Sequence, residues 1–95
     1  MRESFVYILT TKDNTALYTG VTSDLVKRLA QHRTRQGSRF AAKYNVTKLV
    51  HVETYGDIRD AIAREKQIKA GSRQKKVDLI DAENPEWRDL SVDLR

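Results

Sequence analysis

The feature that most constrains the fold is a pair of short segments rich in β-branched and aromatic residues, 5–10 and 17–22. Such segments are typical of β-strands, and the polar residues 11–14 between them are typical of a turn. We therefore expect an antiparallel hairpin. If residues 11–14 form its loop, Tyr7 lies directly opposite Tyr18, with Cβ atoms about 5 Å apart on one face. A slip of one residue would place the two phenols on opposite faces.

A helix is expected directly after the hairpin. Thr22 or Ser23 can cap its first turn, and Asp24 adds negative charge where the helix dipole is positive. The helical pattern continues to about Gln36 and stops at Gly37. The core-facing stripe of this helix consists of Leu25, Leu29 and His32, and the basic residue Arg28 lies beside it.

The second half of the chain predicts one more strand and two more helices. Ser38 can cap a short turn through Phe40, Ala41 and Ala42, and Leu49–Tyr55 reads as the third strand. Asp57 is the expected cap of the second long helix, and Ser72 caps a final helix that stops before Asn84. The apolar stripe of the second long helix consists of Ile58, Ala61, Ile62 and Ile68.

Glu65 lies within that apolar stripe. A carboxylate on a buried face is costly unless it is paired, hydrogen-bonded or bound to a metal ion. Glu65 is therefore a candidate ligand, and a structural ion pair with Arg28 is the simpler alternative.

Composition limits the class of protein. The chain of 95 residues has the length of one domain, which we expect to have a core over about residues 4–83 and an acidic tail over 84–95. Cysteine is absent, which excludes disulfides and thiolate metal sites and fits a cytoplasmic location. No apolar run is long enough to span a membrane. Trp87 in the tail is expected to pack on the domain, or alternatively to contact a protein partner.

The distribution of charge predicts a polyanionic partner. The formal net charge is +5, and the stretch from Leu25 to Val52 contains seven bases and no acid. Such a one-sided stretch is typical of a nucleic-acid-binding surface, although a merely solvated surface is the simpler interpretation.

Two triplets in the hairpin resemble the motifs that name the GIY-YIG nuclease superfamily. Phe5-Val6-Tyr7 stands in place of Gly-Ile-Tyr, and Tyr18-Thr19-Gly20 stands in place of Tyr-Ile-Gly. Arg28, His32 and Glu65 follow at the family's positions, and the resemblance covers nearly the whole chain. It looks closest to the small single-domain group. The departures at Phe5 and Thr19 affect positions that supply no chemistry in the family.

The resemblance implies an α/β domain with a three-stranded, mainly antiparallel sheet flanked by helices in the order β-β-α-β-α-α. It also implies a divalent-metal-dependent endonuclease. Glu65 would hold Mg²⁺ or Mn²⁺, and Arg28 would clamp a phosphate. Tyr7 would act as general base after cationic surroundings lower its pKa. Tyr18 would hold phosphate or water, and His32 would orient Tyr7 or relay its proton.

A second set of residues would track the nucleic-acid backbone beside this site. The bases Lys12, Arg39, Lys43 and Lys48 are candidates for phosphate contacts, and Tyr44 is a candidate for base stacking. An ordinary polar loop is an equal alternative for this set. Asn84 is included as the counterpart of a late asparagine in the family.

Three functions remain open at this point. The first is a DNA endonuclease, with branched, damaged or single-stranded DNA in repair or recombination as candidate substrates. The second is a non-catalytic nucleic-acid-binding module, because a nuclease fold alone does not establish activity. The third is an accessory subunit of a repair assembly that uses the acidic tail as its contact surface.

Overall fold

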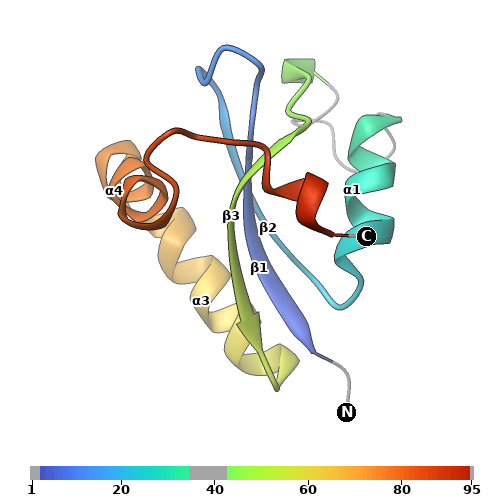
Figure 1. Cartoon of the computed structure of the whole chain (residues 1–95). Coiled ribbons are helices and arrows are strands. Elements are labelled where there is room, and N and C mark those ends of the chain that lie inside the picture. Colours follow the sequence, from blue (N-terminus) through green and yellow to red (C-terminus); the bar gives the residue numbers. More distant parts are fainter. Residues whose placement is uncertain (1–2, 35–42, 95) are drawn as a thin grey trace.

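The computed structural model describes residues 3–34 and 43–94 (Figure 1). In these residues three antiparallel strands, in the order β2-β1-β3, form one sheet. The elements in chain order are β1 Ser4–Thr10, β2 Leu17–Thr22, α1 Leu25–Arg33, β3 Lys48–Tyr55, α3 Ile58–Ala70, α4 Arg73–Glu83 and the 3₁₀ turn η1 Leu90–Asp93. The predicted α/β class and its order of strands and helices are confirmed.

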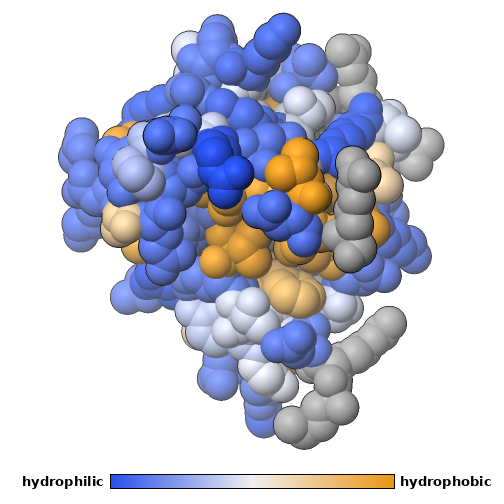
Figure 2. All heavy atoms as spheres, viewed as in Figure 1, coloured by the Kyte–Doolittle hydropathy of each residue, from blue (hydrophilic) through white to orange (hydrophobic). Residues whose placement is uncertain are grey.

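Helices cover both faces of the sheet, α1 and η1 on one side and α3 and α4 on the other (Figure 1). Alternation along β1 supplies both cores, because successive side chains point to opposite faces. Tyr7 and Leu9 pack towards α1, whereas Val6 and Ile8 pack towards α3 and α4. In the view of Figure 2, the exposed hydrophobic side chains lie mainly near the middle of the molecule, and hydrophilic side chains surround them.

The hairpin register differs from the prediction. Tyr7 pairs with Gly20, and Tyr18 pairs with Leu9, so the two tyrosines are diagonal neighbours and do not lie directly opposite each other. The shift is by two residues, which preserves the shared face because side chains alternate with a period of two. The expectation of direct opposition was wrong, and the expectation of a common face is confirmed.

The longer loop explains the shift. Pairing ends at Thr10 and Leu17, so the loop spans residues 11–16. The hydroxyl of Thr11 accepts a hydrogen bond from the Thr15 N–H at 3.0 Å, which holds the loop closed. Asn14 adopts a left-handed φ of 63°, a conformation that asparagine tolerates better than most residues. These local hydrogen bonds favour the wider turn.

Helix α1 is shorter than predicted and has a different cap. Asp24 is the N-cap, and its carboxylate accepts from the Lys27 N–H at 3.1 Å. The Thr22 hydroxyl instead accepts from the Asp24 N–H at 3.0 Å, so the predicted cap at Thr22 or Ser23 was wrong. Thr34 ends the helix, earlier than Gln36. The turn expected at Ser38 lies outside the described residues, as do Gln36 and Gly37.

Helices α3 and α4 begin at the predicted caps, Asp57 and Ser72. The apolar stripe of α3 is narrower than expected, since Ala61 and Ile68 are buried. Ile58 at the helix start and Ile62 on its flank remain 41% and 37% exposed. A three-stranded sheet is narrow, so it covers only the central line of the helix.

The segment after α4 packs on the domain. Trp87 is half-buried against the core beneath α3 and α4, and its indole N–H donates to Asp81 at 2.7 Å. Leu90 and Leu94 pack against the core on the α1 side. Trp87 therefore packs on its own domain, which was the first of the two roles expected for it from the sequence.

Candidate active site

The phenol of Tyr7 lies across the neighbouring strand at Gly20. A Cβ on Gly20 would overlap the Tyr7 hydroxyl oxygen and would lie 2.5 Å from its Cζ. Only a residue without a side chain leaves this space, and glycine inside a strand commonly marks such a close approach. Gly20 belongs to the motif Tyr18-Thr19-Gly20, but no role was predicted for it from the sequence. Its position inside β2 was the available signal.

Three rings meet on this face of the sheet. The Tyr7 hydroxyl and His32 Nε2 are hydrogen-bonded at 3.0 Å, in a buried contact. The Tyr18 ring centroid lies 6.3 Å from that of Tyr7 and 5.1 Å from that of His32. The hairpin supplies the two phenols and α1 supplies the imidazole. The structure thus brings together three of the five predicted catalytic residues in direct ring contact.

Arg28 and Glu65 complete the cluster from two helices. Arg28 is half-buried on α1, and its charge acts on both Tyr7 and His32. Glu65 projects from α3, which packs against β1 and the edge strand β2, and its charge also acts on Tyr7. The other four predicted residues therefore surround Tyr7. The rings of Tyr18 and His32 contact its ring, and the charges of Arg28 and Glu65 act on its hydroxyl.

Glu65 forms an ion pair with Lys69 and not the pair with Arg28 considered from the sequence. The Lys69 Nζ lies 2.7 Å from Glu65 Oε2, one helical turn away. The Glu65 side chain is 13% exposed, whereas that of Lys69 is 52% exposed. The Glu65 carboxylate is thus largely shielded from solvent. The Lys69 ammonium is exposed to solvent, so it can leave the carboxylate while the domain stays folded.

The pKa of Tyr7 is shifted opposite to the prediction. Burial raises it well above its ordinary value, and Tyr18 and Glu65 add to the rise. Arg28 lowers this pKa, but its effect is smaller than that of burial. The expectation of a lowered pKa was wrong, because removal of the phenol from water disfavours the phenolate more than one guanidinium favours it.

Burial favours the neutral form of the His32 imidazole. Burial lowers its pKa below the ordinary value, and the positive charge of Arg28 lowers it further. Its Nδ1 has no hydrogen-bond partner among the described residues, so its polar contact there is the one with Tyr7. A neutral imidazole retains one unprotonated nitrogen, which can accept a proton.

The donor set suits a hard divalent cation with few protein ligands. The described residues contain no group of three or more His, Cys, Asp or Glu side chains that could enclose a metal ion. Glu65 would be the single carboxylate ligand, and its charge acts on the nearby phenol of Tyr7. Mg²⁺ is typically bound in this way, through one or two carboxylates with water and substrate phosphate as the remaining ligands. The residues present fit such an ion.

The predicted nucleic-acid-binding residues are only partly brought together. Lys12 and Tyr44 line one shallow hollow beside the hairpin loop. The Lys43 ammonium lies 5.4 Å from the centre of the Tyr44 ring, and Lys48 is half-buried at the start of β3. Arg39 lies outside the described residues.

Asn84 does not belong to that surface. It is 6% exposed and is the C-cap of α4. Its amide nitrogen donates to the carbonyls of Val50 and Arg88, and its side-chain oxygen accepts from the Arg88 N–H. Assignment of Asn84 to the nucleic-acid-binding set was wrong, because these backbone contacts use its polar atoms inside the domain.

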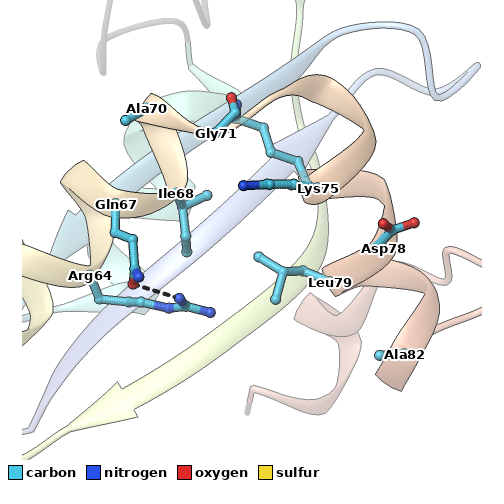
Figure 3. Close-up of a pocket in the computed structure, with 10 residues that line it drawn as sticks. Arg64, Gln67, Ile68, Ala70, Gly71, Lys75, Asp78, Leu79 and Ala82 are labelled. Carbon is cyan, nitrogen blue, oxygen red and sulfur yellow. Dashed lines mark hydrogen bonds between the residues drawn. The ribbon is translucent and has the colours of Figure 1, made fainter.

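A separate hollow of about 530 Å³ lies between α3 and α4 (Figure 3). Ile68 and Leu79 form its apolar part, and Arg64 on its rim is hydrogen-bonded to Gln67 at 2.8 Å. None of the five clustered residues lines it. It is therefore distinct from the candidate active site.

Among the described residues, no helix combines the length and apolar character needed to cross a bilayer.

Comparison with known proteins supports the same family. The sequence pattern of the GIY-YIG catalytic domain matches residues 3–78. A UPF0213 protein of Syntrophus aciditrophicus is 40% identical over 87 residues, which is 90% of this chain and 98% of the relative. The UPF0213 protein SSP2268 of Staphylococcus saprophyticus is 38% identical over 80 residues, covering 84% of this chain and 96% of the relative.

A solved structure shows the same fold. The solution NMR structure of the UPF0213 protein BH0048 from Bacillus halodurans aligns with a TM-score of 0.55 and 30% sequence identity, covering 85% of each chain. The family match spans both hairpin tyrosines, the α1 pair and Glu65. The chain therefore belongs to the GIY-YIG nuclease superfamily, within the small single-domain group that includes the UPF0213 proteins.

Proposed function

We propose that this protein is a divalent-metal-dependent endonuclease that hydrolyses phosphodiester bonds in DNA. The observation that carries the proposal is the Tyr7 hydroxyl, which lies 3.0 Å from His32 Nε2 and within the electrostatic reach of Arg28 and Glu65. Phosphodiester hydrolysis needs a proton acceptor, a clamp for phosphate charge and a ligand for a metal ion. The cluster offers one group for each requirement.

Arg28 and Glu65 have complementary electrostatic roles in this proposal. The planar guanidinium of Arg28 binds the phosphate, which accepts parallel hydrogen bonds from it. Glu65 would hold Mg²⁺ or Mn²⁺ in place of its ion pair with Lys69, and the ion would supply charge stabilisation for the phosphate oxygens. Tyr18 holds the phosphate or the attacking water by its hydroxyl.

Tyr7 and His32 act as a proton relay. A Tyr7 phenol with a raised pKa is neutral, so it cannot accept a proton without releasing its own. The 3.0 Å contact gives that proton a destination, the Nε2 of the neutral His32 ring. The attacking water then passes its proton to the Tyr7 oxygen as the Tyr7 proton passes to His32. This revises the sequence-based role of Tyr7 as an anionic base.

The decisive experiment replaces Glu65 with Gln. Nicking of supercoiled and branched DNA in Mg²⁺ or Mn²⁺ should fall by roughly 100-fold or more, because the metal ligand is lost. Binding of DNA in EDTA should stay within roughly twofold of the unaltered protein. Asp60→Asn is the matched control, since Asp60 is an exposed acid on the same helix. Cleavage that survives Glu65→Gln would exclude Glu65 as the metal ligand.

A non-catalytic nucleic-acid-binding module is the second candidate. The Lys69–Glu65 ion pair favours it, because an ammonium already neutralises the carboxylate that would hold a metal ion. In that case the protein would bind DNA in a salt-dependent manner without nicking any substrate shape in Mg²⁺ or Mn²⁺. Lys69→Met separates the two candidates, since removal of the competing ammonium should strengthen binding of Mn²⁺ to the DNA-free protein only if Glu65 is a metal ligand.

A further inference from the structure

Three neighbouring hollows of about 290, 370 and 630 Å³ follow β2 into the hairpin loop. Leu17 and Lys76 line both the first and the second hollow, and Ala16 and Tyr44 line both the second and the third. We call this path the edge groove. It leads from Tyr18 at one end to Lys12 in the hairpin loop at the other.

Positive charge dominates the edge groove. Its lining contains four bases and one acid, namely Lys12, Lys69, Arg73, Lys76 and Asp13. Asp13 accepts hydrogen bonds from the hydroxyls of Thr11 and Thr15, which bind it within the hairpin loop. Arg73 donates to the carbonyl of Asn14 at 3.3 Å, which fixes this guanidinium beside the loop. The groove therefore presents a row of cations along one strand.

The floor and wall of the edge groove suit bases. Ala16 and Leu17 supply apolar floor, and Tyr44 is an aromatic wall with 45% of its surface exposed. Proteins that hold single strands combine a basic groove with aromatic side chains on which bases stack. A base can stack on such a ring only after it has left its partner strand. The combination thus favours a single strand over a duplex.

The edge groove opens onto the active site. Tyr18 lines its first hollow, and so does Lys69, whose ammonium lies 2.7 Å from Glu65. In the described part of the chain β2 is an edge strand, so no strand pairs with its outer side there. A polynucleotide in the groove would therefore pass directly from the hairpin loop to the carboxylate of Glu65.

We propose that the edge groove binds one strand of nucleic acid and delivers its scissile phosphate to the Tyr7–Glu65 cluster. Lys69, Arg73, Lys76 and Lys12 would contact successive phosphates, and Tyr44 would stack on a base. This inference rests on the proposed nuclease function for the final step, but the binding it describes is independent of cleavage. The substrate class is a single-stranded segment, whether free or next to a duplex.

The test measures binding of a labelled single-stranded oligonucleotide in EDTA, where cleavage plays no part. Lys69→Gln combined with Arg73→Gln should weaken binding roughly tenfold and reduce the slope of log K against log salt by about 1.4, the value for two phosphate contacts. Tyr44→Ala should weaken it by roughly 5- to 150-fold through loss of stacking.

The matched control is Lys66→Gln combined with Lys75→Gln. These exposed bases lie on the same helices and outside the edge groove, and their removal changes the net charge equally. Binding should change less than roughly threefold in this control, because only diffuse charge is lost. Equal losses in both double variants would overturn the groove. Equal losses for a duplex of the same sequence would overturn its single-strand preference.

The outcome is separable from that of the nuclease proposal. If Glu65→Gln shows no loss of cleavage while the groove variants lose single-strand binding, the groove stands and the catalytic assignment fails. If cleavage requires Glu65 but the groove variants bind normally, the substrate takes another path. Circular dichroism spectra of all variants at the assay temperature should match, since the substituted side chains of Lys69, Arg73 and Tyr44 are substantially exposed.

Discussion

Gly20 determines where the Tyr7 hydroxyl can lie. The phenol crosses β2 in the space that any side chain at position 20 would occupy. The hydroxyl thereby reaches His32 on α1. At the scale of single residues, the geometry of the candidate active site therefore requires glycine at position 20.

Gly20→Ala tests this dependence. The added Cβ would overlap the Tyr7 oxygen, so either the phenol or the strand must move. We expect a loss of about 1–3 kcal/mol in the free energy of unfolding, the range for overpacking a core, and a large loss of nicking. Urea unfolding and a cleavage assay would measure the two effects.

Gly56→Ala is the control for that substitution, because nothing lies within 4 Å of the Cβ position there. Its free energy of unfolding should stay the same or rise slightly, since alanine restricts the unfolded chain. Unchanged nicking in Gly20→Ala would show that the position of the Tyr7 hydroxyl is not critical.

His32 predicts the pH dependence of cleavage. The relay requires a neutral imidazole, so the rate should fall as pH falls through the pKa of His32. Burial and Arg28 place that pKa below the ordinary 6.5. The rate at pH 6.5 should therefore stay above half of its maximum, and the decline should come at lower pH. Single-turnover rates across this range would measure the decline.

His32→Gln should remove this acid-side decline together with most of the activity. A decline centred at or above pH 6.5 would contradict the neutral-imidazole relay. Denaturation must be measured at each pH, because a buried neutral histidine also destabilises the fold when it becomes protonated.

At the scale of elements, Glu53 joins β3 to α3. Arg64 on α3 donates to both of its carboxylate oxygens, at 2.8 and 3.1 Å. His51 and Tyr55, on the same strand, donate to it at 2.8 and 2.7 Å. This network positions the helix that carries Glu65. Sequence periodicity could place Glu53 on a strand and Arg64 on a helix but could not pair them.

The Glu53 network predicts loss of stability in acid. Burial acts to raise the pKa of Glu53, but hydrogen bonds from Arg64, His51 and Tyr55 hold it at about 2, below the ordinary 4.5. A lowered pKa contributes stability that is present above pH 4.5 and is lost as pH falls through about 2. Glu53→Gln should therefore cost about 1–3 kcal/mol at neutral pH, and less in acid.

Urea unfolding at pH 7 and pH 3 would measure this difference. Glu86→Gln is the control, because Glu86 is exposed on the surface. An equal loss at both pH values would show that the carboxylate charge of Glu53 does not stabilise the fold.

At the scale of the whole molecule, the segment after α4 closes the domain across both layers. Asn84 binds the carbonyl of Val50 on β3, and Asp89 accepts from the Leu49 N–H at 3.2 Å. Ser91 accepts a hydrogen bond from Arg33 of α1. A tail that ends helix α4, contacts β3 and reaches α1 is part of the folded unit.

Removal of residues 84–95 should therefore destabilise the protein. Asn84→Ala alone deletes three hydrogen bonds to backbone groups and should lower the free energy of unfolding by about 2–3 kcal/mol. Thermal melts of the truncated chain and of Asn84→Ala would measure the loss. Glu86→Ala serves as the control at an exposed position. An unchanged melting temperature in the truncated chain would show that residues 84–95 do not stabilise the domain, and would favour their role as a contact surface for a protein partner.

The sequence alone determined the elements and the membership of the cluster. Strand segments and the caps at Asp57 and Ser72 follow from short patterns, because they depend on interactions among residues a few positions apart. The candidate site residues Tyr7, Tyr18, Arg28, His32 and Glu65 follow from the resemblance of their motifs to those of the family. They are therefore readable without knowledge of the three-dimensional packing.

Only the tertiary structure decided the hairpin register, the direction of the Tyr7 pKa shift, the Lys69 partner of Glu65 and the burial of Asn84. The loop hydrogen bonds widened the turn beyond what residue types indicated. The pKa of Tyr7 depends chiefly on how much water the packing of the domain removes from around its phenol. Interactions of this kind arise between segments distant in sequence, so local pattern carries no record of them.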